Sequence, residues 1–241
     1  MLDTDGDILK GDEKPHINNK YNVCKADFEC AIDTNTGKHK QFMISYKLNN
    51  DSIKTISGWD CNREFLEVVP DNTIIYFHNL DYDSRFLLRV GNDLQIINNE
   101  ECIQQNPGFI WHNNKFKMVT VDYKGKTLVL KCSYALISAP IRDFPKMFGL
   151  DSGDKEVMPY KAYNQNLFKE QYVSIDSFAS HLTKPEQITQ FKENIKRLNI
   201  YDPNDSTRFD PIAYAQYYCE QDVRIMDQGY ETFRKQIKEM T

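Results

Sequence analysis

Long apolar segments, spaced cysteines and clustered histidines are all missing from this 241-residue chain. No hydrophobic run approaches the roughly 20 residues that a membrane-spanning helix needs, which argues against any membrane partner. The six cysteines have no CxxC spacing and the five histidines form no ligand-like set, so we expect reduced packing cysteines and no zinc. No signal peptide is recognisable. We therefore expect a cytosol-like reducing compartment, such as a host or viral replication site, and not secretion.

An excess of positive charge is also lacking. The 30 Lys and Arg residues are outnumbered by 35 Asp and Glu residues, and the formal net charge is −5. Because proteins that read duplex DNA are usually basic, this balance argues against an extended duplex-binding surface. A local basic strip remains an alternative to an ordinary solvated face, and its candidates are Lys115, Lys117, Lys124, Lys126, Lys131 and Arg142.

The remaining composition fits one globular domain. Hydrophobic residues make up 40% of the chain and charged residues 27%, which is enough to bury a core, and no internal repeat is visible. Residues 1–19 contain five acids and little apolar material. We therefore expect a flexible N-terminal segment over 1–19 and one domain over residues 20–241.

Alternation and helical periodicity predict a mixed α/β domain. The segments that favour strands are 21–32, 40–46, 52–57 and 73–78, with a hairpin around Lys124-Gly125-Lys126 within 115–130. The segments that favour helices are 62–69, 84–88, 141–149, 184–198 and 210–226. Residues 151–180 are polar and irregular, so loops over the functional face are expected there.

The first predicted strand carries an acidic pair. Asp27 and Glu29 are two residues apart, so their side chains share one face of the strand. Two carboxylates on one face repel each other unless cations or protons intervene. A solvated strand edge is the alternative explanation for this pair alone.

A second polar group follows the apolar strand at 73–78. Asn79 and Asp83 lie at the transition from this strand to a helix, where side chains gather at the carboxyl end of a sheet. The alternative is a cap for the helix that follows, a role that Asp81 could fill.

The third group lies in the helical pattern that starts near Pro211. Tyr218 and Asp222 are four residues apart and therefore neighbours on one helix face. Packing and a simple hydrogen bond would explain this pair if it stood alone.

Taken together and in order, the three groups supply a complete set of metal ligands. Asp27, Glu29, Asp83 and Asp222 offer the acidic oxygens that hold two Mg²⁺ or Mn²⁺ ions about 4 Å apart in phosphodiester cleavage. Their combination, rather than any one group, indicates a metal-dependent exonuclease.

The ordered combination resembles the 3′→5′ exonuclease, or proofreading, domain of protein-primed family B DNA polymerases. Three further segments match this family: Tyr76-Phe77-His78-Asn79-Leu80, Tyr123-Lys124-Gly125-Lys126-Thr127 and Ser133-Tyr134. Lys155, five residues before Tyr160, resembles the catalytic lysine of the family, with Lys161 as its rival. The resemblance implies an RNase H-like α/β fold with a mixed central sheet flanked by helices. It departs from the family pattern at Cys30 and Cys132, neither of which is a metal ligand.

The resemblance also implies roles and partners. Its metal ligands are Asp27, Glu29, Asp83 and Asp222, while Tyr218 would orient the attacking water and Lys155 would stabilise charge on the phosphate. The side chains that would grip a DNA strand are Asn79, Tyr82, Ser133 and Tyr134. The expected partners are a single-stranded DNA 3′ end and a polymerase domain or terminal protein outside this chain, which itself shows no polymerase motif. The alternative function is a catalytically silent DNA-binding or interaction module derived from a polymerase.

Overall fold

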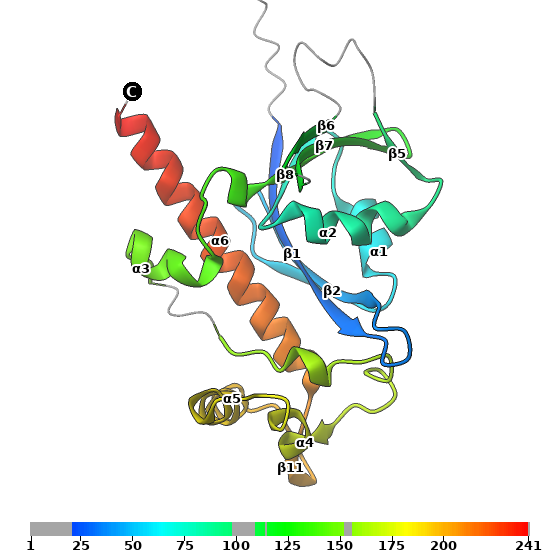
Figure 1. Ribbon diagram of the computed structural model, residues 1–241, viewed down its shortest axis with the longest axis vertical. Helices are drawn as coiled ribbons and strands as arrows, with labels where there is room; N and C mark the ends of the chain where they lie inside the picture. Colours follow the sequence, from blue (N-terminus) through cyan, green and yellow to red (C-terminus); the bar gives the residue numbers. More distant parts are fainter. Residues whose placement is uncertain (1–20, 98–108, 114, 152–155, 241) are drawn as a thin grey trace, which may run out of the picture.

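A mixed eight-stranded sheet forms the centre of the protein in a computed structural model that describes residues 21–97, 109–113, 115–151 and 156–240 (Figure 1). The strand order is β3-β2-β1-β4-β8-β7-β5, and β6 also pairs with β7. Strand β4 runs parallel to β1 and β8, and the other pairings are antiparallel. The strands are β1 (Asn22–Ile32), β2 (His39–Leu48), β3 (Lys54–Ser57), β4 (Thr73–Phe77), β5 (Leu94–Ile96), β6 (Phe109–His112), β7 (Lys115–Tyr123) and β8 (Lys126–Cys132).

Two short helices cover one face of this sheet. They are α1 (Cys61–Val68) and α2 (Leu80–Leu87), followed by the 3-10 turn η1 (Leu88–Val90). Alternate residues of β1, among them Ala26 and Phe28, point into this layer, where Phe28 stacks on Phe77 of β4 with ring centroids 5.8 Å apart. Asp27 and Glu29 therefore lie on the opposite face.

The long helix α6 (Pro211–Met240) crosses that opposite face over β1, β2 and β3 (Figure 1). Asp210 caps it by accepting the backbone N–H groups of Ile212 and Ala213 at 2.9 and 3.0 Å, and Pro211 takes the first helical position as predicted. A buried ion pair fixes the helix to the sheet, because Asp227 lies 2.9 Å from Lys25 Nζ and 2.5 Å from Lys47 Nζ. This fixation sets where the middle of α6 meets β1.

A smaller unit packs against the first turns of α6. It contains a three-stranded sheet of β10 (Tyr201–Asp202), β11 (Asp205–Phe209) and β9 (Val173–Ser174), together with α4 (Ile175–Ala179) and α5 (Pro185–Leu198). Its aromatic core includes Phe178, Phe191 and Phe209, and Tyr214 joins it from α6. Residues 151–180 are therefore not only loops, because β9 and α4 form within them.

Helix α3 (Phe144–Phe148) packs against the middle of α6. The turns η3 (Ser133–Ala135), η4 (Ile141–Asp143) and η5 (Tyr160–Ala162) connect these parts. Gly229 of α6 faces Phe144 so closely that an added Cβ would lie 2.4 Å from the ring carbon Cδ2. The glycine therefore allows the two helices to approach.

Most predicted elements are confirmed, including the hairpin whose turn residues Lys124 and Gly125 have φ angles of 52° and 82°. The start of α2 was predicted too late. The helix begins at Leu80 after Asn79, whose φ of 76° is left-handed, and Asp81 does not cap it. No helix within the described ranges is long and apolar enough to cross a membrane. The expected N-terminal segment 1–19 and Lys155 lie outside the described residues.

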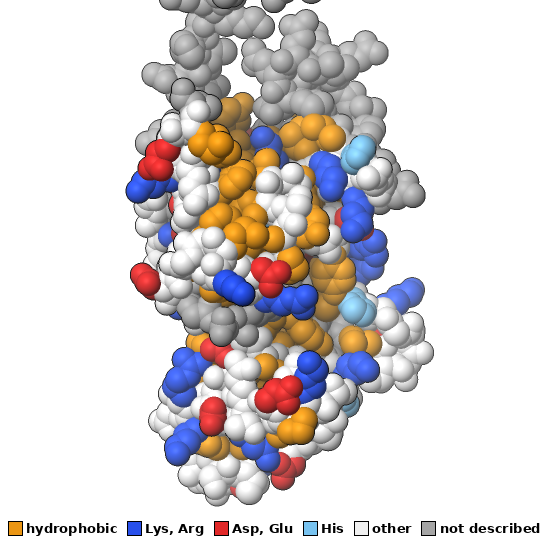
Figure 2. All heavy atoms as spheres, turned by 60° about the vertical axis from the view of Figure 1, so that its left-hand side comes forward, with side chains coloured by type: hydrophobic (Ala, Val, Ile, Leu, Met, Phe, Trp, Pro, Cys, Tyr) orange, Lys and Arg blue, Asp and Glu red, His pale blue; other side chains and the backbone are white. Residues whose placement is uncertain are grey.

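The six candidates for a basic strip do not all lie on one face. Lys124 pairs with Glu67 at 2.5 Å and Lys126 Nζ donates to three backbone carbonyl groups at the end of α1. Lys131 lies opposite Met118 in the ladder and therefore faces away from Lys117. On the face shown in Figure 2, basic side chains are interspersed with acidic and uncharged ones over its lower part.

Candidate active site

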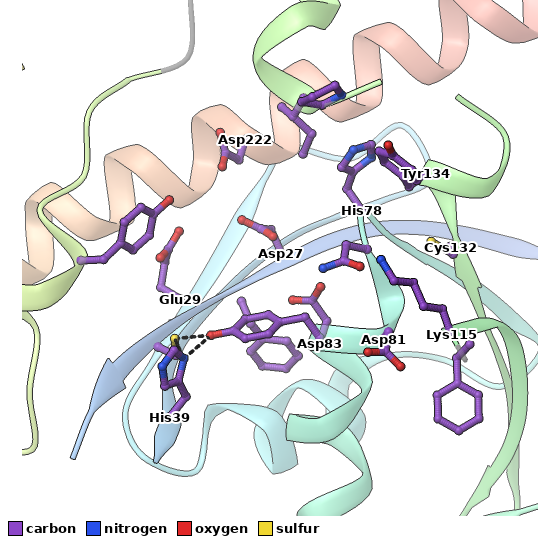
Figure 3. Close-up of a pocket in the computed structure, with 18 of the residues that line it drawn as sticks. Asp27, Glu29, His39, His78, Asp81, Asp83, Lys115, Cys132, Tyr134 and Asp222 are labelled. Atoms are coloured by element: carbon purple, nitrogen blue, oxygen red, sulfur yellow. Dashed lines mark hydrogen bonds between the residues drawn. The ribbon is translucent and has the colours of Figure 1, made fainter. Parts of the chain in front are cut away.

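A cavity of about 850 Å³ opens at the carboxyl end of β4, between the second half of β1 and the β7–β8 hairpin (Figure 3). We call it the acid cleft, because all four predicted metal ligands line it: Asp27, Glu29, Asp83 and Asp222. They come from β1, α2 and α6, which are far apart in the sequence. Strand β4 ends at Phe77 while β1 continues to Ile32, and this difference in length opens the space.

The acidic pair of β1 lies beside an irregularity in the sheet. The register with β2 shifts between Glu29 and Cys30, so that Phe42 is the extra residue in β2. Glu29 is only 3% exposed. A carboxylate oxygen of Asp27, one of Glu29 and the Cys219 sulfur all lie within 4.8 Å of one another. Because the Cys219 thiol donates to the Asp27 carbonyl oxygen at 3.3 Å, it fixes the β1 backbone rather than a carboxylate.

Asp83 enters the same cleft from the first turn of α2. The left-handed conformation of Asn79 turns the chain sharply after β4, and this turn brings Asp83 beneath β1. Burial and, next, the charge of Asp27 hold the pKa of Asp83 well above its usual range, although the backbone N–H of Phe28 partly offsets both effects. In the metal-free protein, this carboxyl group is therefore in an unfavourable environment for its ionised form.

The middle of α6 supplies Asp222 and Tyr218. Asp222 is buried at the edge of the acid cleft and points toward Asp27 in Figure 3. The Tyr218 ring is 1% exposed and lies beside the cleft rather than in its lining, and its hydroxyl contacts the Tyr160 hydroxyl at 2.5 Å. Burial and then the charge of Asp222 raise the pKa of Tyr218, so this phenol keeps its proton.

The residues predicted to grip a DNA strand divide into two groups. Asn79, Tyr82 and Tyr134 line the acid cleft, and Tyr134 is 40% exposed. Ser133 does not line the cleft, and its predicted contact with a DNA strand stays a prediction. The serine is buried, donates to the Phe77 carbonyl oxygen at 3.3 Å and lies 3.0 Å from His78 Nδ1. It therefore positions the chain at the end of β4.

Several residues of the cleft were not predicted as site residues, among them Tyr160, His39 and Cys30. Tyr160 of η5 lines it and reaches Tyr218, and only the spacing from Lys155 pointed to it in the sequence. His39 of β2 contacts the Tyr82 hydroxyl at 2.7 Å, and Cys30 Sγ contacts the same hydroxyl at 2.7 Å. Burial raises the pKa of Cys30 to about 11, so its thiol stays protonated. No sequence pattern connects His39 with Tyr82, because 43 residues separate them.

The structure does not decide between Lys155 and Lys161 as the catalytic lysine. Lys155 lies outside the described residues, and Lys161 is exposed and absent from the lining of the acid cleft. Lys115 and Lys117 of β7 are the cationic side chains among the described lining residues. Figure 3 shows Lys115 extending toward the centre of the cleft.

The donor set of the acid cleft fits hard divalent cations. Mg²⁺ and Mn²⁺ prefer carboxylate oxygens, and the cleft offers four carboxylates from three elements. Burial and, next, the charge of Asp27 raise the pKa of Asp83, and a bound divalent cation would offset both effects. The residues present therefore fit the predicted ions.

Comparison with known proteins assigns the chain to a family. The family described as DNA polymerase type B, organellar and viral, matches residues 65–241, so the chain belongs to this family. A search of curated proteins finds no match. Among solved structures, Phi29 DNA polymerase complexed with primer-template DNA is 16% identical with a TM-score of 0.50, covering 90% of this chain and 32% of that one. Phi29 DNA polymerase complexed with single-stranded DNA is 15% identical with a TM-score of 0.48 and has the same coverage.

These comparisons confirm the predicted family and fold. The domain has the RNase H-like α/β fold, with a mixed central sheet flanked by helices. The chain spans about a third of the length of the polymerase structures that it matches. Its membership of the family described as DNA polymerase type B, organellar and viral, supports a polymerase-related role.

Proposed function

We propose that the protein is a two-metal 3′→5′ exonuclease that hydrolyses single-stranded or frayed DNA ends to mononucleotides. The convergence of four carboxylates from β1, α2 and α6 on one cavity carries this proposal. A protein without catalysis gains nothing from holding these like charges together, since their repulsion costs stability. The family membership supports a proofreading role beside the polymerase domain of a protein-primed DNA polymerase.

Asp27, Glu29, Asp83 and Asp222 would hold two Mg²⁺ or Mn²⁺ ions. When bound, such ions stabilise the leaving oxygen and lower the pKa of the attacking water. Asp83 must lose the proton favoured by its burial before it can bind a cation.

The remaining side chains would bind and orient the substrate. The Tyr218 hydroxyl, fixed by Tyr160, would hydrogen-bond the attacking water and orient it toward the phosphorus. Lys155 would stabilise negative charge on the phosphate or on the leaving oxygen. The exposed ring of Tyr134 would stack on an unpaired base, and Tyr82 and Asn79 would line the path of the strand.

The partners and compartment follow from the same proposal. The substrate is a single-stranded DNA 3′ end, and a polymerase domain or terminal protein would deliver it. A reducing replication compartment is supported by five free cysteines among the described residues: Cys24, Cys30, Cys61, Cys132 and Cys219.

The decisive experiment uses 5′-end-labelled single-stranded DNA with and without Mg²⁺. We expect stepwise shortening from the 3′ end that stops in excess EDTA. Asp27→Ala and Asp222→Ala should each lower the rate by several orders of magnitude, because each removes a predicted ligand. Asp176→Ala is the matched control, since Asp176 is 86% exposed on α4 and pairs only with Lys192 among the described residues. Binding of DNA without any Mg²⁺- or Mn²⁺-dependent cleavage would favour the catalytically silent module instead.

A further inference from the structure

A second cavity of about 650 Å³ adjoins the acid cleft and differs from it in charge. We call it the cationic cavity. Four cationic side chains line it against two carboxylates, whereas five carboxylates line the acid cleft against two lysines. The charged lining residues of the cationic cavity are Lys38, Lys40, Arg63, Arg89, Asp33 and Asp60.

The two cavities meet at His39, which lines both of them. Arg89 Nη1 donates to the His39 carbonyl oxygen at 2.9 Å, so an arginine of the cationic cavity fixes the residue that the cavities share. On the other side, the His39 ring contacts the Tyr82 hydroxyl of the acid cleft (Figure 3). The two cavities therefore lie next to each other, on either side of His39.

The positive charge of the cationic cavity is available to a ligand. Within the described residues, no ion pair involves Lys38, Lys40 or Arg89, whereas Arg63 pairs with Asp93 at 2.6 Å. The opposing Asp33 carboxylate is already engaged, because it accepts the backbone N–H groups of Asn35 and Thr36 at 2.9 Å each. Asp33 interacts with Lys38 as well, but four cationic side chains against two carboxylates leave the cavity with an excess of positive charge.

An aromatic surface lies next to these cations. Trp59 lines the cationic cavity, and Lys40 Nζ lies 4.8 Å from the centroid of its ring. The Phe168 ring packs nearly perpendicular to the Trp59 ring, with the two centroids 5.1 Å apart. An indole beside mobile ammonium groups is the combination that binds single-stranded nucleic acid, because bases stack on the ring while the cations neutralise phosphates. A free inorganic anion has no base that could stack on the indole, so the indole would not contribute to its binding.

From this arrangement, we propose that the cationic cavity binds the phosphates and one base of single-stranded DNA on the 5′ side of the cleavage point. This inference rests on the proposed exonuclease function, which places the 3′ end in the acid cleft. The acid cleft repels phosphates before cations bind, so attraction for the strand must come from elsewhere. In a chain with a net charge of −5, the cationic cavity supplies that attraction next to the site.

The test measures binding in EDTA, so that neither hydrolysis nor metal binding contributes. In a Trp111→Phe background, Trp59 is the only tryptophan, and its fluorescence reports directly on the cationic cavity. Oligothymidylates of 2, 4, 6 and 10 nucleotides are titrated together with the mononucleotide dTMP. We expect Trp59 quenching by the longer strands, with an affinity that rises by at least about tenfold between the shortest and the longest.

Two sets of variants separate charge from structure. Lys38→Gln with Lys40→Gln should weaken binding of the ten-nucleotide strand by about tenfold or more. The slope of log affinity against log salt concentration should also become shallower by about 1.4, which corresponds to two single-strand phosphate contacts at about 0.7 each. Lys38→Arg with Lys40→Arg should restore both values. Lys196→Gln is the matched charge control, because Lys196 lies on α5 and lines neither cavity.

Three results would overturn the inference: wild-type affinity in the double glutamine variant, no change in Trp59 fluorescence, or equal binding of dTMP and the longest strand. The last result would identify a mononucleotide site. Failure of the exonuclease proposal would instead show as an absence of Mg²⁺-dependent cleavage. The two failures are distinguishable because the binding test is carried out without metal.

Discussion

The Asp83 carboxyl group is buried away from water and lies close to the Asp27 carboxylate, so its ionised form is destabilised. Because its folded-state pKa lies above the usual value of 3.8, the folded protein binds this proton more tightly than the unfolded chain does. The stability that protonation contributes is present at low pH and is lost as the pH rises through the folded-state pKa. Asp83→Asn should therefore melt at a higher temperature than wild type in EDTA, with a margin that widens above about pH 4.

Asp81→Asn is the control for this melting experiment, since Asp81 lines the same cleft but forms an exposed ion pair with Arg85 at 3.0 Å. Such a pair is worth only about 0.3–0.5 kcal/mol, so the melting temperature should hardly change. A margin for Asp83→Asn that shrinks with rising pH would contradict the predicted environment of Asp83.

Tyr218 differs from the carboxylates because it would act on water and not as a ligand. Tyr218→Phe removes one hydroxyl and leaves the ring in its buried position, so the cleavage rate should fall by about 10²–10⁴-fold while metal affinity persists. Rate measurements on labelled DNA, combined with calorimetric Mn²⁺ titrations, separate these effects. Loss of Mn²⁺ binding equal to that of Asp222→Ala would contradict the role assigned to Tyr218.

Individual site residues were predictable to the extent that local spacing fixes them. Asp27 and Glu29 share a face in any strand, and Tyr218 and Asp222 are neighbours in any helix. By contrast, no local rule places Ser133 inside the protein against His78, because that contact depends on how β8 ends beside β4. The contact between His39 and Tyr82 depends in the same way on tertiary packing.

At the scale of elements, strands with strong alternation were predicted well and element ends less well. Helix α2 starts earlier than predicted because Asn79 adopts a left-handed conformation, which the sequence permits but does not require. Short elements such as β9 and α4 were missed in a polar segment, since their stability comes from packing on α5 and β11 rather than from local propensity.

The approach of α3 to α6 depends on Gly229. Gly229→Ala should destabilise the protein by about 1–3 kcal/mol, because the new methyl group collides with the fully buried Phe144 ring. The gain in helix propensity of about 1 kcal/mol offsets only part of this cost. Urea denaturation measures the change. In a double-mutant cycle, Phe144→Leu should recover part of the loss, and additivity of the two substitutions would contradict this contact.

For the whole molecule, charge decides the choice of substrate. With a net charge of −5, few phosphate contacts are available to offset the cost of unpairing a duplex end. Mismatched 3′ ends should therefore be cut about tenfold or more faster than paired ends.

Matched and mismatched primer-templates of one length provide this comparison, with the single-stranded primer as the reference. In a trap experiment, the enzyme should release the DNA after one or a few cuts. Its affinity for DNA should decline only shallowly as the salt concentration rises. Equal rates on both ends, or a salt slope typical of a protein with six to ten phosphate contacts, would indicate a duplex-binding surface.

Helix α6 is one uninterrupted segment of 30 residues that takes part in two separate cores, one through Tyr214 and Cys219 and the other through Ile225 and Met226, and Asp222 lies between them. Local unfolding in the middle of such a helix would disrupt the packing of both cores at once. Its central amide protons should consequently exchange with deuterium only when the entire domain opens, at one common free energy. The smaller unit around α5 and the large sheet would then behave as a single foldon, and the geometry at Asp222 would persist until global unfolding.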